Sequence, residues 1–199
     1  MDGKRLCSIV TFFFVAFGIT FPARAGEPMQ QIKQTTDRIL AVLSDPVLKP
    51  AAKSEERKKL IGKAVDERFD WEEMSRRSLA RHWAQRTPEE KKEFIPLFRN
   101  LLEQTYLDKV QGYSGEKVSY EGDSVDGEYG LVKVKILTTT NKEIPVEYRL
   151  LKRGNNWLVY DISIEGISLI NNYRSQFNSI ITKSTYKELV QRLKAKAVQ

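Results

Sequence analysis

Residues 157–177 read WLVYDISIEGISLINNYRSQF, and this stretch decides the fold of the chain. Its first half alternates with the period of a strand. The alternation predicts one face made of Leu158, Tyr160, Ile162 and Ile164 and an opposite face made of Trp157, Val159 and Asp161. After Gly166 the apolar residues recur every three or four positions, as in a helix. A half-buried strand therefore leads directly into an amphipathic helix that can fold back over a sheet.

Three further strands are predicted upstream, at 117–120, 131–139 and 144–151, because apolar and polar residues alternate there. The connections at 141–142 and 154–156 are short enough for antiparallel hairpins. We therefore expect a meander of about four antiparallel strands with one apolar face and one solvated face that carries lysines.

Helical patterns flank these strands on both sides. A first helix is expected around 32–43 and a second around 60–65, and Asp70 is expected to cap a third. Thr87-Pro88-Glu89-Glu90 is the clearest helix start, because it combines a capping box with proline at the first helical position. A second capping box, Thr185 with Glu188, begins the last helix. The fold class is α+β, an antiparallel sheet covered on one face by several helices that enclose an apolar cavity.

The N-terminal segment and the length of the remaining chain predict an exported protein with a single domain. Residues 1–25 combine a basic start, an apolar run and Ala23-Arg24-Ala25, as in a cleaved signal peptide. Cleavage would leave 26–199 as one domain, remove the only cysteine, and lower the net charge from +7 to +5, since three basic residues and one acidic residue leave with the signal. Such a chain must be stabilised by burial rather than by disulfides. An exported basic protein without a groove-reading motif is not expected to bind nucleic acid.

The sequence offers little support for an enzyme. His82 is the only histidine, and no cysteine survives signal removal, so a zinc site is not expected. Phosphate-binding loops and the common hydrolase motifs are absent from the sequence. Asp161 and Glu165 are the carboxylates expected nearest the interior, and ion pairing with Arg149 or Arg174 is the favoured role for them. We expect no catalytic residues, no bound metal and no cofactor.

Three segments of the chain resemble the MlaC (toluene-tolerance auxiliary) family of periplasmic phospholipid-binding proteins. The first is FDWEEMS at 69–75 followed by LARHW at 79–83, and the second begins TPEE at 87–90 and ends TY at 105–106. The third is IPVEYRL at 144–150 together with 157–177. The chain departs from the pattern at Ala80, where members of the family commonly have glycine.

The resemblance implies a periplasmic carrier that maintains the lipid asymmetry of the outer membrane. Such a carrier moves phospholipid between an outer-membrane lipoprotein/porin complex and an inner-membrane ABC transporter with its membrane-bound lipid-binding subunit. Two alternatives stay open: a carrier of a hopanoid or another polycyclic lipid, and an interaction module that carries no lipid.

If the chain holds lipid, the acyl chains need apolar walls. We predict that the aromatic helix, the apolar sheet face and the helix after Gly166 supply them. The predicted wall residues are Trp83, Phe94, Phe98, Val134, Ile136, Val146, Tyr148, Tyr160, Ile162, Ile170, Tyr173 and Phe177. Arg149 and Arg174 either pair with acids inside or lie near a headgroup at the mouth, and pairing is the favoured interpretation.

Overall fold

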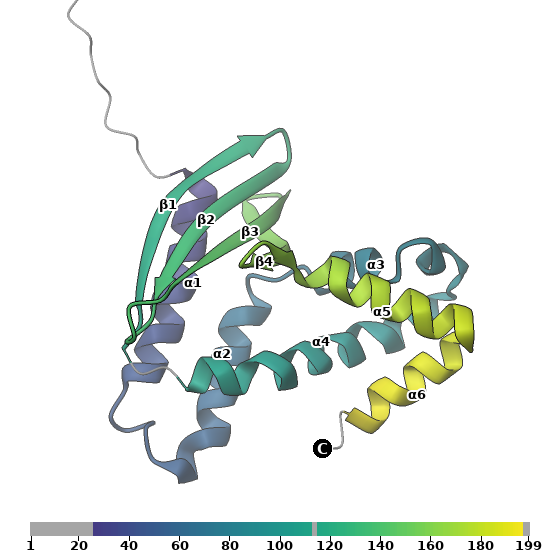
Figure 1. Cartoon of the computed structure of the whole chain (residues 1–199), viewed down its shortest axis with the longest axis horizontal. Helices are drawn as coiled ribbons and strands as arrows, with labels where there is room; N and C mark the ends of the chain where they lie inside the picture. Colours follow the sequence, from purple (N-terminus) through teal and green to yellow (C-terminus); the bar gives the residue numbers. More distant parts are fainter. Residues whose placement is uncertain (1–25, 113–114, 197–199) are drawn as a thin grey trace, which may run out of the picture.

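A computed structural model describes residues 26–112 and 115–196, so the predicted signal peptide lies outside the described residues. An antiparallel sheet with α1 on one face occupies one end of the molecule, and the remaining helices extend from it (Figure 1). Within the described residues the α-helices are α1 Glu27–Ser44, α2 Ser54–Asp66, α3 Trp71–Leu79, α4 Pro88–Gln111, α5 Leu169–Lys183 and α6 Tyr186–Lys196. Two short 3₁₀ turns, η1 Ala51–Lys53 and η2 Ala80–Gln85, precede α2 and follow α3. No helix in these two ranges is long and apolar enough to cross a membrane.

The sheet confirms the predicted antiparallel meander. Its strands follow the order β1-β2-β3-β4-β5. Their bounds are β1 Lys117–Asp126, β2 Tyr129–Leu137, β3 Glu143–Arg153, β4 Asn156–Ile164 and β5 Ile167–Ser168. The first four are the predicted strands, although β1 and β3 are longer than expected and β2 covers 129–137 instead of 131–139. Strand β5 is a two-residue addition that pairs with the end of β4. The α+β class is thereby confirmed.

A β-bulge in β4 overturns one part of the prediction. Asp161 pairs with Arg149, but the next pair is Val159 with Leu150, so Tyr160 is left without a partner in the ladder. An extra residue shifts every later side chain to the other face. Trp157 and Val159 therefore share a face with Ile162 and Ile164, not the opposite face, and all four belong to one apolar cluster.

The N-terminus of α1 is fixed to the sheet by a carboxylate. Asp123 in β1 accepts hydrogen bonds from the backbone N–H groups of Gly26 (3.1 Å) and Met29 (3.2 Å). These N–H groups lie at the helix start, where they have no partner within the helix. The ring of Trp157 lies over Gly130, where an added Cβ would come within 3.0 Å of it. Together these contacts seat α1 on the inner face of the sheet.

Local signals predicted the starts of α3, α4 and α6 correctly, whereas α1 and α2 begin earlier than expected, at Glu27 and Ser54. The Asp70 side chain accepts from the Glu73 N–H and caps α3. Thr87 and Glu90 form both hydrogen bonds of a capping box before α4, at 3.2 and 3.0 Å. Thr185 accepts from the Glu188 N–H before α6. Pro96 is accommodated inside α4, which runs through it as one helix.

Candidate functional site

The buried apolar residues form two separate clusters. One lies among the helices and is formed mainly by α3, α4, α5 and α6. The other lies on the inner face of the sheet, under α1. The half-buried ring of Phe69, in the segment between α2 and α3, packs against both. The backbone around Phe69 also joins the two parts, because the Asp70 N–H donates to the Val159 carbonyl and the Val159 N–H donates to the Arg68 carbonyl.

The helical cluster is an assembly of aromatic rings. Phe98 is fully buried, and its ring centroid lies 5.4 Å from those of Tyr173 and Phe177 in edge-on contacts. Phe94 stacks on Phe98 at 5.9 Å and meets Phe177 edge-on. Such ring pairs add to the stability that burial alone provides. This part of the interior is densely packed.

The sheet cluster is buried less evenly. Val132, Val134 and Leu150 are almost completely buried, as expected for residues covered by a helix. Other apolar residues on the same face keep accessible surface, and they gather toward β3 and β4 and the far end of β2: Ile136, Ile144, Tyr148, Ile162 and Ile164. We call these five residues the open row. Ile136 pairs with Ile144 and Tyr148 pairs with Ile162, and Ile164 pairs with the buried Val146, which lies between these two pairs on the same face.

Tyr148 is the one residue of the open row with a polar group. Burial raises the pKa of its hydroxyl to about 12, so the side chain lies deep among protein atoms. The same residue is nevertheless only partly buried. Tyr148 and its neighbours in the open row are therefore part of the apolar interior without being completely covered by protein atoms.

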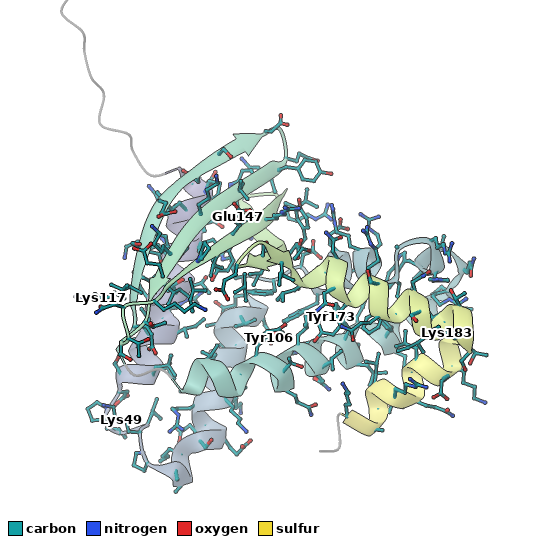
Figure 2. The ribbon with its side chains drawn as sticks, viewed as in Figure 1. Lys49, Tyr106, Lys117, Glu147, Tyr173 and Lys183 are labelled. Carbon is teal, nitrogen blue, oxygen red and sulfur yellow. The ribbon has the colours of Figure 1, made fainter. Side chains whose placement is uncertain are left out.

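Two tyrosines lie on the helical side of the interior, where α4 and α5 approach each other (Figure 2). Burial, together with the neighbouring Tyr173, raises the pKa of Tyr106. Tyr106 is half-buried, whereas Tyr173 is buried. Helix α4 packs mainly on α2, α3 and α6 rather than on the sheet.

The twelve predicted wall residues divide between the two clusters. The helical cluster holds seven of them, namely Trp83, Phe94, Phe98, Tyr160, Ile170, Tyr173 and Phe177. The sheet cluster holds the other five, Val134, Ile136, Val146, Tyr148 and Ile162. The structure thus places every one of them in the interior or at its edge, and their contact with a lipid stays a prediction. Ile144 and Ile164 pack against the same sheet cluster and are not among the predicted wall residues, although the two-residue alternation of their strands places them on that face.

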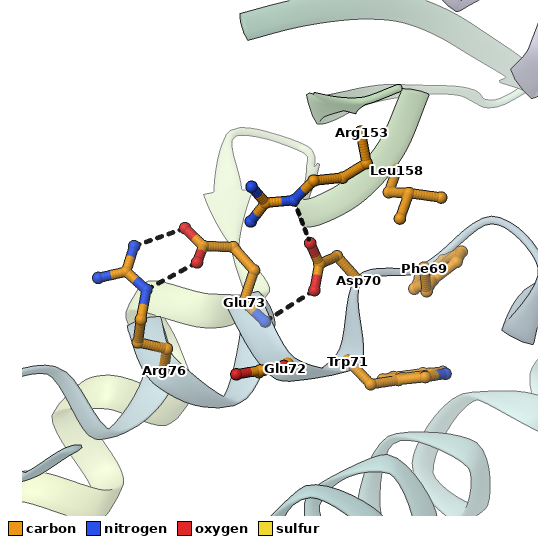
Figure 3. A pocket seen from close by; sticks show the side chains of 8 residues that line it. All are labelled: Phe69, Asp70, Trp71, Glu72, Glu73, Arg76, Arg153 and Leu158. Carbon is orange, nitrogen blue, oxygen red and sulfur yellow. Dashed lines mark hydrogen bonds and ion pairs between the residues drawn. The ribbon is translucent and has the colours of Figure 1, made fainter. Parts of the chain in front are cut away.

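A surface pocket of about 530 Å³ lies where α3 meets the β3–β4 hairpin (Figure 3). Arg153 pairs with Asp70 at 3.3 Å, and Arg76 holds both oxygens of Glu73 at 2.6 Å. Arg77 adds a third bond to Glu73, at 2.7 Å. These hydrogen bonds, that of Arg76 foremost, lower the pKa of Glu73 to about 2. The arginines and these two acids satisfy one another, and none of the predicted wall residues lines this pocket.

The structure corrects the predicted roles of the interior carboxylates. Asp161 is buried, as expected, but it accepts from the Ser168 hydroxyl (2.7 Å) and from the Ile170 N–H (3.1 Å) at the start of α5. Glu165 is exposed and pairs with Lys142. Across 26–112 and 115–196, neither acid pairs with Arg149 or Arg174, so the favoured ion pairs are wrong. Asp161 instead positions α5 on the end of β4.

His82 lies in a second pocket, of about 370 Å³, between the α3–η2 junction and α5. Its Nε2 is 3.1 Å from Oδ1 of Asn178, and Arg81 donates to the same oxygen at 2.8 Å. The described residues contain no cluster of three or more ligand-type side chains that could hold a metal ion.

The family model described as "MlaC protein" matches residues 33–195 of this chain. The chain belongs to the MlaC family. A relative from Haemophilus influenzae, named intermembrane phospholipid transport system binding protein MlaC, is 20% identical over 202 residues, covering 98% of this chain and 94% of its own. Toluene tolerance protein ttg2D of Pseudomonas putida is 27% identical over 92 residues, 46% of this chain and 43% of its own.

A solved structure shares the fold of this MlaC family member. It is the phospholipid-binding protein from Ralstonia solanacearum in complex with a phospholipid, with a TM-score of 0.78 and 26% identity. The match covers 87% of this chain and 98% of that one. The segments that carry the family resemblance form α3, α4 and the β3–β4–α5 region. These elements bear most of the two clusters, so the family motifs build the interior of the protein.

Proposed function

We propose that this protein is a periplasmic carrier that encloses the acyl chains of a phospholipid between the inner face of its sheet and helices α4 and α5. The observation that carries the proposal is the open row, a set of apolar residues on the inner face of the sheet that the protein itself leaves partly accessible. The phospholipid seen in the complex of the R. solanacearum protein supports the same ligand class.

The energetics explain why a carrier needs such a surface. Each CH₂ group removed from water contributes about 0.8 kcal/mol, so two ordinary acyl chains left in water cost on the order of 20 kcal/mol. A lipid alone therefore rarely crosses an aqueous compartment. The open row provides isoleucine and tyrosine surface that gains from burial when an acyl chain covers it.

The route of the lipid is the second part of the proposal. The carrier takes phospholipid between an outer-membrane lipoprotein/porin complex and an inner-membrane ABC transporter with its lipid-binding subunit, and so maintains lipid asymmetry. The name of the H. influenzae relative, a binding protein of an intermembrane phospholipid transport system, supports this role. The carrier itself needs no cofactor and performs no catalysis.

Native mass spectrometry of the mature protein, followed by lipid extraction, tests the cargo. We expect a discrete adduct of phospholipid mass. An adduct of triterpenoid mass would show that the cargo is a polycyclic lipid and not a phospholipid. An empty protein in repeated preparations would favour an interaction module without cargo.

A pair of variants tests where the cargo lies. Ile162→Glu places a charge in the open row, whereas Ile167→Glu makes the same change at a residue that is 64% exposed. We expect Ile162→Glu to lose co-purifying lipid, because a carboxylate is costly beside an acyl chain, while Ile167→Glu keeps it. Circular dichroism would establish that both variants are folded. Full lipid content in a folded Ile162→Glu variant would contradict the proposed location.

A further inference from the structure

The pocket around His82 carries positive charge that no carboxylate lining it balances. Its lining residues are Leu79, Ala80, Arg81, His82, Arg174, Ser175 and Asn178. In the described part of the chain, neither Arg81 nor Arg174 has a carboxylate within ion-pair distance. The pocket beside Asp70 is the opposite case, because its arginines bond to Asp70 and Glu73.

The groups that converge on this pocket are hydrogen-bond donors. An amide oxygen only accepts, so Arg81 and His82 both donate to Oδ1 of Asn178. That arrangement turns the NH₂ group of Asn178 away from these two donors, and this group has no partner among residues 26–112 and 115–196. The Arg174 guanidinium is exposed and equally unpartnered there. Donors from α3–η2 and from α5 thus surround one small space.

The backbone at the edge of the pocket is strained. Ala80 has φ 47° and ψ −121°, a conformation that glycine adopts readily and alanine adopts only at an energetic cost. This conformation ends α3 and turns the chain into η2, which brings Arg81 and His82 beside α5. Strain of this kind persists where surrounding structure holds it, and it gathers at functional sites.

We propose that this pocket binds a phosphate group. Guanidinium groups bind phosphate through charge-assisted hydrogen bonds in a fixed geometry. Donors approaching from two elements suit a tetrahedral oxyanion better than a planar carboxylate, which one guanidinium can satisfy alone. The volume of about 370 Å³ accommodates such a group. The phosphate comes either from a phospholipid headgroup at a membrane surface or from free phosphate in solution.

The site is separate from the proposed cargo cavity. Ile170, Tyr173 and Phe177 of α5 point into the helical cluster, whereas Arg174, Ser175 and Asn178 line the pocket on another side of the same helix. A phosphate group can therefore bind in this pocket whether or not acyl chains enter the protein. The proposal therefore does not depend on the proposed cargo, and an empty interior would leave it standing.

His82 provides a direct reporter, because it is the only histidine in the chain. The imidazole signals of the untagged mature protein are followed by NMR while inorganic phosphate is added, with chloride at matched ionic strength as the reference. In parallel, binding is measured to vesicles of phosphatidylglycerol and of phosphatidylcholine. Arg174→Gln is the mildest variant, since Arg174 is exposed and has no ion pair among the described residues, and Arg81→Gln/Arg174→Gln is the stronger one.

A matched control removes the same charge elsewhere. Lys133→Gln/Arg149→Gln changes two exposed cations on the outer face of the sheet. We expect phosphate to shift the His82 signals, and the pocket variants to weaken binding at least about tenfold, because they lose charge-assisted hydrogen bonds. The control should keep most of the binding.

The two probes identify the source of the phosphate. Vesicle binding that depends on the pocket residues assigns the site to lipid headgroups, and pocket-dependent binding of inorganic phosphate alone assigns it to free phosphate. The proposal is overturned if neither probe binds at His82, or if pocket and control variants lose binding equally.

Discussion

Replacing Glu73 by glutamine should remove a stabilisation that depends on pH. The Glu73 carboxylate is buried and accepts three hydrogen bonds, two from Arg76 and one from Arg77. Glutamine has nearly the same shape but no charge, so Glu73→Gln removes the ion pairs without leaving a large cavity.

The magnitude follows from the pKa of the carboxyl group, which falls from 4.5 to about 2 on folding. One pKa unit corresponds to about 1.36 kcal/mol, so the full shift is worth about 3 kcal/mol. The Arg76 side chain is 51% exposed, and water screens part of the interaction. We therefore expect about 2 kcal/mol. Because the folded pKa is the lower one, this stability is present above about pH 4.5 and is lost as the pH falls toward about 2.

The assay compares the free energies of unfolding of the wild type and Glu73→Gln in urea at several pH values. The difference between the two proteins should be about 2 kcal/mol at pH 7 and should become small near pH 2, where about half of the Glu73 carboxyl groups are protonated in the folded protein. All other carboxylates titrate in both proteins and cancel. A difference that stays constant from pH 7 to pH 2 would refute the assignment of the low pKa to Glu73.

Three further substitutions test the fold by thermal or urea unfolding at pH 7. Ala80→Gly should stabilise the protein by about 1 kcal/mol, because it relieves strain at φ 47° that exceeds the entropic cost of glycine; a loss of stability would mean that the strain is absent. Phe98→Ala should destabilise it by about 4 kcal/mol, since a fully buried ring leaves a cavity, and a cost below 1 kcal/mol would show that the aromatic cluster is loosely packed. Asp123→Ala should cost about 1 kcal/mol through the lost cap of α1, and no change would exclude that role.

Local features of the fold could be predicted from the sequence because their causes lie within a few residues. The capping box of Thr87 and Glu90 and the cap at Asp70 both join groups three residues apart. The strands and their hairpins followed from alternation and short turns in the same way. The family resemblance then indicated how these elements assemble.

Features that depend on contacts between residues far apart in the sequence could not be predicted. The bulge at Tyr160 arises from the register between β3 and β4, and a pattern within one strand cannot reveal it. For the same reason the sequence alone favours an arginine partner for Asp161, although its partners are Ser168 and the start of α5. The pocket around His82 joins residues almost 100 positions apart, as its contact with Asn178 shows.

The central claim is that acyl chains lie against the open row. Isoleucine methyl NMR tests it most directly, using a phospholipid with a spin label midway along one acyl chain. We expect the methyl signals of Ile136, Ile144, Ile162 and Ile164 to broaden strongly, while that of the exposed Ile167 stays sharp. Broadening at Ile167 with unaffected signals from the open row would place the lipid on the outside of the protein and contradict the account.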